Sequence, residues 1–202
     1  MKKKTINVIT LGDSNVGKTS IIQRIKDGTF NEYVKATVYL DNFIIERKYE
    51  KKNIMINLVF KDTAGEEKHQ EVPMQYIRDS HVVLLVFCDI KSLNTIKKRW
   101  LNFYKENSNI ENTRFILIGN KSDIFGNERE EIIRQGEKFA EELDAHFITC
   151  SAKSADNMDN LDRYISTEAK RFIDEEGKNN EDLDNQSFAI KHEKKTEKKG
   201  CC

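Results

Sequence analysis

Short apolar runs alternate along the chain with segments whose apolar residues recur at helical spacing. Alternating apolar positions between 54 and 60 predict a strand with one buried face. Continuous apolar runs at 82–87 and 115–118 predict strands that are buried on both faces. Further strands are expected at 6–11, 38–49 and 146–149. Helices are expected from about residue 17, over 92–107, and along apolar stripes at 132–143 and 158–172.

This alternation of strands and helices is typical of an α/β domain with a mostly parallel sheet. We expect six strands flanked by about five helices. The link between the strands at 38–49 and 54–60 is too short for a crossover, so this pair is predicted to be antiparallel. Polar and charged residues dominate after about residue 177. We therefore expect a folded domain over 1–176 and a disordered tail over 177–202.

A phosphate-binding motif follows the first predicted strand. Residues 12–19 read GDSNVGKT, which matches GxxxxGK[ST] between a strand and a helix. Backbone N–H groups of such a loop bind phosphate oxygens, Lys18 would reach the β- and γ-phosphates, and the Thr19 hydroxyl would ligate Mg²⁺. The motif indicates the P-loop NTPase fold and an NTPase or kinase. The expected contacts are Asp13, Ser14, Asn15, Val16, Gly17, Lys18, Thr19 and Ser20.

Two further segments indicate a guanine site. Residues 120–123 (NKSD) and 151–153 (SAK) each follow a predicted strand, where open α/β sheets bind ligands. The Asp123 carboxylate would accept hydrogen bonds from the N1–H and 2-amino groups of guanine, and adenine offers neither donor. Lys121 would cover the base, and a backbone N–H near Ala152 would donate to O6. The expected base-side residues are Asn120, Lys121, Asp123, Ser151, Ala152 and Lys153.

The ordered set GDSNVGKT, DTAG, NKSD and CSAK resembles the Ras-superfamily GTPases over roughly residues 5–175. The resemblance implies a molecular switch that binds GTP or GDP with Mg²⁺ and hydrolyses GTP. It makes Asp123 the residue that selects guanine. Phe30 is similar to the family aromatic that packs on the base edge, although an ordinary core position is an equal alternative.

The resemblance also implies two switch segments that respond to the γ-phosphate. Thr37 would ligate Mg²⁺ through its hydroxyl and meet the γ-phosphate through its N–H in the GTP state. Asp62 would hold Mg²⁺ through a water, and the Gly65 N–H would bond the γ-phosphate. The implied metal ligands are Thr19, Thr37 and Asp62. The candidate catalytic residues are Lys18, Thr37, Gly65 and Glu66.

Glu66 departs from the family pattern, which places a glutamine there to orient the attacking water. A carboxylate adds negative charge beside the γ-phosphate and lacks the amide N–H₂ group. We therefore expect weak intrinsic GTP hydrolysis, and a hydrolysis-deficient GTP-bound adaptor is an alternative. A P-loop kinase or ATPase is a further alternative, against which Asp123 argues.

The chain ends in Cys201 and Cys202, which resembles the doubly prenylated end of Rab proteins. Two lipid chains anchor stably where one does not. Residues 191–199 hold five lysines and two glutamates, a balance that favours an anionic leaflet. The resemblance implies a Rab-like GTPase in vesicle trafficking, in the cytosol and on the cytoplasmic face of an intracellular membrane. The implied partners are prenylation machinery, a GDP-dissociation inhibitor, an exchange factor, a GTPase-activating protein and effectors; a non-Rab Ras-type signalling GTPase is the alternative.

Composition and single positions refine this picture. The 202 residues carry 34 Lys+Arg and 34 Asp+Glu, so net charge offers no argument for nucleic-acid binding. No apolar run approaches the roughly 20 residues of a membrane-spanning helix. Cys88 and Cys150 are expected to be small buried hydrophobes. Rabs usually carry tryptophan before DTAG, where this chain has Lys61. Strand alternation predicts that Lys61 is exposed, which would alter the effector-facing surface.

Overall fold

The computed structural model describes residues 2–33, 41–63, 74–108 and 113–176. Met1–Ala169 form one compact unit and Lys170–Cys202 a second. In the second unit, the described residues 170–176 are helical. The sheet and the candidate site described below belong to the first unit.

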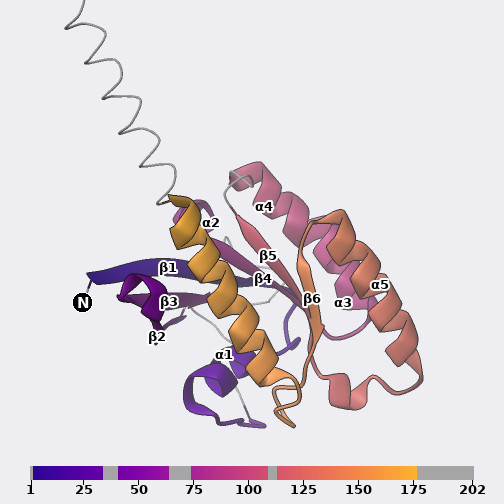
Figure 1. Cartoon of the computed structure of the whole chain (residues 1–202). Coiled ribbons are helices and arrows are strands. Elements are labelled where there is room, and N and C mark those ends of the chain that lie inside the picture. The colour runs from indigo at the N-terminus through magenta and orange to yellow at the C-terminus, as the bar shows by residue number, and fades with distance from the viewer. Residues whose placement is uncertain (1, 34–40, 64–73, 109–112, 177–202) are drawn as a thin grey trace, which may run out of the picture. The chain divides into compact units, whose positions relative to one another are not determined.

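A six-stranded sheet with the order β2-β3-β1-β4-β5-β6 forms the centre of the first unit (Figure 1). β2 pairs antiparallel with β3, and all other pairings are parallel. This confirms the predicted sheet and its antiparallel pair. The 3-10 turn η1 (Glu50–Lys52) and Asn53, with a φ of 49°, make the short link. The strands are β1 (Lys2–Leu11), β2 (Asp41–Tyr49), β3 (Ile54–Asp62), β4 (Val82–Phe87), β5 (Arg114–Gly119) and β6 (His146–Thr149).

Helices connect the strands, and one more helix follows the last strand. They are α1 (Lys18–Asp27), α2 (Met74–Arg78), α3 (Ile90–Thr95), the π-helical turn η2 (Ile96–Trp100), α4 (Leu101–Asn107), α5 (Arg129–Glu142) and a helix that begins at residue 158. Two 3-10 turns, η4 (Ser122–Ile124) and η5 (Gly126–Glu128), follow β5. The segment predicted as one helix over 92–107 is thus three consecutive helical pieces. In the described part of the chain, no helix combines the length and the apolar character that crossing a bilayer requires.

A capping box explains why the first of these pieces begins earlier than predicted. Asp89 Oδ1 accepts a hydrogen bond from the Ser92 N–H at 2.7 Å, and Ser92 Oγ accepts one from the Asp89 N–H at 3.1 Å. These bonds satisfy N–H groups that a helix start leaves unpaired. The apolar stripe alone does not mark this start, because Asp89 and Ser92 are polar.

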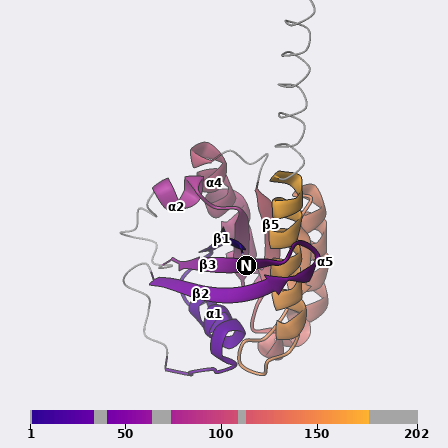
Figure 2. The same cartoon turned by 60° about the vertical axis from the view of Figure 1, so that its left-hand side comes forward.

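Helices cover both faces of the sheet. One face packs against α2, α3, η2, α4 and α5; its core includes Ile9, Leu11, Val83, Leu85, Phe87, Leu117, Leu93, Ile96 and Phe139. The other face is covered by α1 and the helical residues 158–169 (Figure 1), and there the alternate strand residues Ile6, Val8, Leu84, Ile116 and Ile118 are buried. Strands covered on both faces appear as continuous apolar runs. β2 lies at the edge of the sheet beside β3 (Figure 2).

Lys61 does not follow its prediction, because its side chain is buried, with only 6% exposed. It lies on the strand face opposite Phe60, as alternation predicts, but that face is covered at this point. Lys61 Nζ lies 4.4 Å from the centre of the Tyr76 ring of α2. Burial lowers the pKa of Lys61 and nearby Asp79 opposes the shift. The sequence pattern predicts the face of the strand correctly but not the helix that covers it.

The two cysteines of the domain differ in burial. Cys150 is fully buried, which confirms its prediction, whereas Cys88 is only half-buried. Burial raises the pKa of Cys150 to about 12 and also raises that of Cys88. Both thiols therefore remain protonated and weakly nucleophilic at neutral pH.

Candidate functional site

The loop between β1 and α1 wraps around Lys18. Its Nζ donates hydrogen bonds to the carbonyl oxygens of Gly12 and Asp13, each at 2.9 Å. Burial lowers the pKa of Lys18 to about 8, and the nearby carboxylates of Asp62 and Asp13 oppose that shift. The ammonium is thus held inside the loop, where a bound anion would stabilise its charged form.

The two glycines of the loop are required by close approach of other groups. A Cβ on Gly12 would lie 2.2 Å from the Val86 carbonyl oxygen. A Cβ on Gly17, whose φ is 93°, would lie 2.3 Å from Asn120 Nδ2. Only glycine fits both the spacing and, at Gly17, the left-handed backbone. The motif glycines are therefore explained by packing of the loop against β4 and the segment after β5.

A hydroxyl and a buried carboxylate meet beside Lys18. Thr19 Oγ1 donates to Asp62 Oδ2 at 2.6 Å, and Thr10 Oγ1 donates to Asp62 Oδ1 at 3.3 Å. Asp62 is fully buried, and burial raises its pKa against the opposing effect of these hydrogen bonds and of Lys18. The structure therefore brings together Thr19 and Asp62, two of the three predicted metal ligands. Thr37 lies outside the described residues.

The oxygen donors of Thr19 and Asp62 fit Mg²⁺, which prefers hard oxygen ligands. Within the described ranges, no group of three or more His, Cys, Asp or Glu side chains could hold a metal ion. The protein would thus supply few ligands at this point. That is typical of Mg²⁺ sites in which waters and substrate phosphates complete the coordination.

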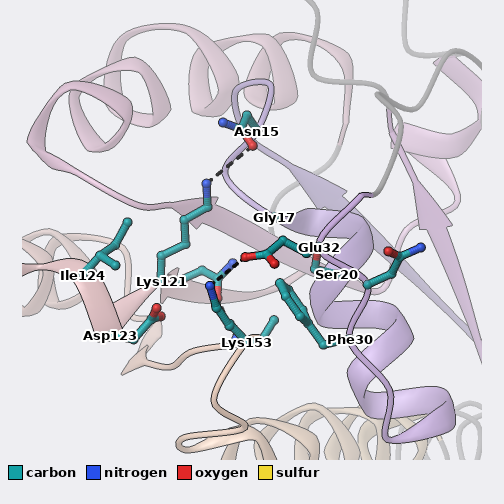
Figure 3. Close-up of a pocket in the computed structure, with 12 residues that line it drawn as sticks. Asn15, Gly17, Ser20, Phe30, Glu32, Lys121, Asp123, Ile124 and Lys153 are labelled. Carbon is teal, nitrogen blue, oxygen red and sulfur yellow. Dashed lines mark hydrogen bonds and ion pairs between the residues drawn. The ribbon is translucent and has the colours of Figure 1, made fainter.

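A cavity of about 260 Å³ lies next to the phosphate loop (Figure 3). It is lined by Asn15, Gly17, Ser20, Phe30, Asn31, Glu32, Asn120, Lys121, Asp123, Ile124, Ala152 and Lys153. Phe30 is half-buried and lines this cavity, so it is not a residue of the domain core, and its contact with a base stays a prediction. Asn31, Glu32 and Ile124 were not predicted, and adjacency to Phe30 and Asp123 was the only sequence signal for them.

Ser151 is fully buried and holds Asp123 in place. Its Oγ donates to Asp123 Oδ1 at 2.5 Å and accepts from the Ser154 N–H at 3.1 Å. Ser151 is not among the residues that line the cavity, and its predicted contact with the nucleotide stays a prediction. The structure shows its hydroxyl bound to the carboxylate that does line the cavity.

Asn120 joins the two halves of the site. Its Nδ2 donates to the Val16 carbonyl oxygen at 2.8 Å, and its Oδ1 accepts from the Ala152 N–H at 3.2 Å. The side chain is nearly fully buried. The backbone N–H expected to bind O6 was placed near Ala152, and the N–H of Ala152 itself is engaged by Asn120.

Arg24 of α1 is hydrogen-bonded to the segment that contains Ala152 and Lys153. Its Nε donates to the Ala152 carbonyl oxygen at 2.8 Å, and its Nη2 donates to the Lys153 carbonyl oxygen at 3.0 Å. The sequence analysis did not single out Arg24. Nothing in its local sequence separates it from the other charged residues of the helix.

An ion pair lies at the rim of the cavity. Lys153 Nζ and Glu32 Oε1 are 2.8 Å apart, and the two side chains are 59% and 64% exposed (Figure 3). Their hydrogen bond lowers the pKa of Glu32 and raises that of Lys153. On the other side, Lys121 Nζ reaches to 3.5 Å from Asn15 Oδ1. These contacts join the base-side segments to the phosphate loop and to the segment after α1.

The remaining predicted residues fall into two groups. Asp13 is half-buried, Ser14 is exposed and Val16 is buried, all within the loop before α1. Gly65, Glu66, Cys201 and Cys202 lie outside the described residues, as Thr37 does.

A comparison with protein-family models matches residues 7–171 to the model described as Ras family. The match covers well over half of the chain. It includes the phosphate loop, Asp62 and both base-side segments, and thus every element that builds the cavity.

Proposed function

This chain belongs to the Ras family, whose members are small GTPase switches, and we propose that its cavity binds GTP or GDP together with Mg²⁺. The observation that carries this proposal is the Asp123 carboxylate, which lines the cavity and is held by the buried Ser151 hydroxyl at 2.5 Å. A fixed carboxylate at this point complements the two N–H donors of guanine. Phe30 borders the same cavity and would pack on the base.

The residues of the loop between β1 and α1 would bind the phosphates. Lys18 places its ammonium at the centre of the loop, and the backbone N–H groups at the start of α1 add positive potential. Mg²⁺, when bound by Thr19 and Asp62, would supply further charge to neutralise the phosphates. Thr37 and Gly65 would bind the γ-phosphate in the GTP state and release it after hydrolysis, which is the proposed switch.

Competition between nucleotides tests base selection. The full chain is loaded with labelled GDP and challenged with GTP or ATP, alongside Asp123→Ala and the exposed control Glu142→Ala. We expect GTP to compete and ATP to fail. Asp123→Ala should lose about a hundredfold in GTP affinity or more, because each hydrogen bond to a charged group contributes about 1.5–3 kcal/mol. Equal competition by ATP would contradict the proposal.

Hydrolysis is proposed to be weak because Glu66 stands where the family has glutamine. A single-turnover assay compares the native chain with Glu66→Gln, and we expect the glutamine variant to hydrolyse GTP faster. Equal or faster hydrolysis by the native chain would refute this. The family match favours a switch that hydrolyses GTP. The alternative is a hydrolysis-deficient adaptor, and the absence of hydrolysis in both proteins would support it.

We further propose a Rab-like, prenylated protein that acts in vesicle trafficking on the cytoplasmic face of an intracellular membrane. The support is the terminal pair Cys201 and Cys202 and the lysine-rich segment 191–199. Mass measurement of the C-terminal peptide from eukaryotic cells, with Cys201→Ser/Cys202→Ser as control, should show two prenyl groups on the native chain alone. An unmodified native peptide in the membrane fraction would contradict the proposal. Regulators, a GDP-dissociation inhibitor and effectors are the partners that this proposal entails.

A further inference from the structure

The single tryptophan of the chain lies against the phosphate loop. Trp100 is 5% exposed, and its Nε1 donates a hydrogen bond to Asp13 Oδ1 at 2.9 Å. The two residues are far apart in the sequence and belong to different elements. This contact therefore links the helical segment after β4 directly to the loop that holds Lys18.

The indole comes from an irregular turn of the helical segment. Trp100 is the last residue of the π-helical turn η2, between α3 and α4. One extra residue in a helical turn rotates the following side chains by about 100° relative to an uninterrupted α-helix. π-helical turns are rare and are frequently found at functional sites. The ring itself is packed in the core with Ile96, Leu101 and Phe139, so its orientation is fixed.

Asp13 is the only acidic residue of the loop 12–19, and its charge is unfavourable for phosphate binding. Its own carbonyl oxygen accepts from Lys18 Nζ at 2.9 Å, so the residue lies at the centre of the phosphate site. A free carboxylate here would repel a polyphosphate and compete for the Lys18 ammonium. The indole N–H instead binds one of its oxygens.

We propose that Trp100 is a positioning residue that holds the Asp13 carboxylate away from the bound phosphates and thereby slows nucleotide release. The proposal rests on guanine-nucleotide binding as the function. A purely structural role, in which Asp13 only satisfies a buried indole N–H, predicts something different. In that case, loss of the N–H would affect the protein in the same way whether or not residue 13 carries a charge.

A double-mutant cycle on the full chain separates the two roles. Trp100→Phe keeps an aromatic ring but removes the N–H, and Asp13→Asn removes the charge. We expect Trp100→Phe to speed release of labelled GDP about tenfold, as for loss of a hydrogen bond to a charged group. In the Asp13→Asn background the same change should alter release less than about twofold. Equal acceleration in both backgrounds would overturn the proposal.

Tyr104→Phe is the matched control for loss of a buried polar atom in the neighbouring helix. The Tyr104 hydroxyl bonds with Ser80 at 2.8 Å and Thr113 at 3.0 Å, and neither residue belongs to the nucleotide cavity. Tyr104→Phe should lower the melting temperature without changing GDP release. Faster release from this variant, to the same extent as from Trp100→Phe, would also overturn the proposal.

The indole resonance tests the contact itself. Because the chain has one tryptophan, an ¹⁵N-labelled sample gives a single indole N–H signal. We expect Asp13→Ala to shift this signal strongly, and an unmoved signal would overturn the proposal. Failure of the proposed function would appear separately, as absence of bound GDP in the native chain.

Discussion

The phosphate side and the base side of the cavity are held by different kinds of interaction. On the phosphate side there are buried bonds, from Lys18 Nζ to the Gly12 carbonyl oxygen and from Thr10 Oγ1 to the fully buried Asp62. On the base side, a part-buried bond from Ser151 to the exposed Asp123 is accompanied by the exposed pair of Glu32 and Lys153. Breaking a buried hydrogen bond costs about 1–3 kcal/mol, whereas an exposed ion pair contributes about 0–1 kcal/mol. Buried contacts of the folded domain thus hold the residues of the phosphate side in place. The residues at the rim of the base side are held by weaker contacts, so their positions change more easily.

The largest expected effect on nucleotide binding comes from a substitution of Gly17 in the phosphate loop. Gly17→Ala would place a Cβ 2.3 Å from Asn120 Nδ2 in a left-handed backbone with φ 93°. Strain and the disturbed Asn120 bond together should cost about 3 kcal/mol, or roughly a hundredfold in GDP affinity. Equilibrium binding of labelled GDP measures this loss.

Gly28→Ala is the control for the backbone penalty alone. Gly28 is also left-handed, with φ 67°, but a Cβ there meets nothing within 4 Å. It should lower stability by about 1 kcal/mol and leave GDP affinity nearly unchanged. Similar losses of affinity in both variants would show that the contact with Asn120 is unimportant.

A smaller effect is expected on the base side from Ser151→Ala. Loss of its hydroxyl frees Asp123, which should weaken GTP binding about tenfold by removing one hydrogen bond to a charged group. Since the phosphate loop is untouched, ATP binding should not weaken in parallel, so the GTP-to-ATP preference should fall. Competition assays with both nucleotides check this.

Ser154→Ala is the matched control, because Ser154 contributes only its backbone N–H to this network. Its base preference should equal that of the native chain. If Ser151→Ala weakened GTP and ATP binding to the same extent, the bond between Ser151 and Asp123 would stabilise the domain and would not orient the carboxylate that recognises the base.

The smallest effect is expected at the exposed rim. Glu32→Gln removes the ion pair with Lys153, and GDP should leave about two- to fivefold faster at low salt. At about 1 M salt the difference should vanish, because screening already suppresses such pairs. Glu50→Gln, which breaks the remote pair with Lys48 at 2.7 Å, serves as control and should not change release. A difference that persists at high salt would mean that Glu32 acts other than by charge.

The strands could be predicted because each is marked by its own local pattern. The apolar runs of β4 and β6 predict their bounds without error, and the short link after β2 predicts the antiparallel pair. The three-part helix from α3 to α4 could not be predicted, because the apolar stripe continues through the π-helical turn. The prediction that Lys61 is exposed was wrong, because its burial involves Tyr76, which comes from a separate element.

The candidate site also has parts that the sequence predicts and parts that it does not. The motifs around Lys18 and Asp123 are contiguous in the sequence and indicate their chemistry directly. The contacts of Asn120, Arg24 and Trp100 join segments that are distant in the chain, so no local pattern reports them. Ser151 was predicted as a nucleotide contact because its motif adjoins the cavity, while its burial behind Asp123 requires the fold.

Two of the hydrogen bonds of the Asn120 side chain connect the phosphate loop to the base-side segment. One amide group restrains both Val16 and Ala152, so a ligand that orders one loop also reduces the freedom that the other must lose. Guanosine and free triphosphate, offered as separate molecules, should consequently each strengthen the binding of the other. A nucleotide bound in the cavity would gain this cooperativity in a single event, and Asn120 would be the side chain that couples its two ends energetically.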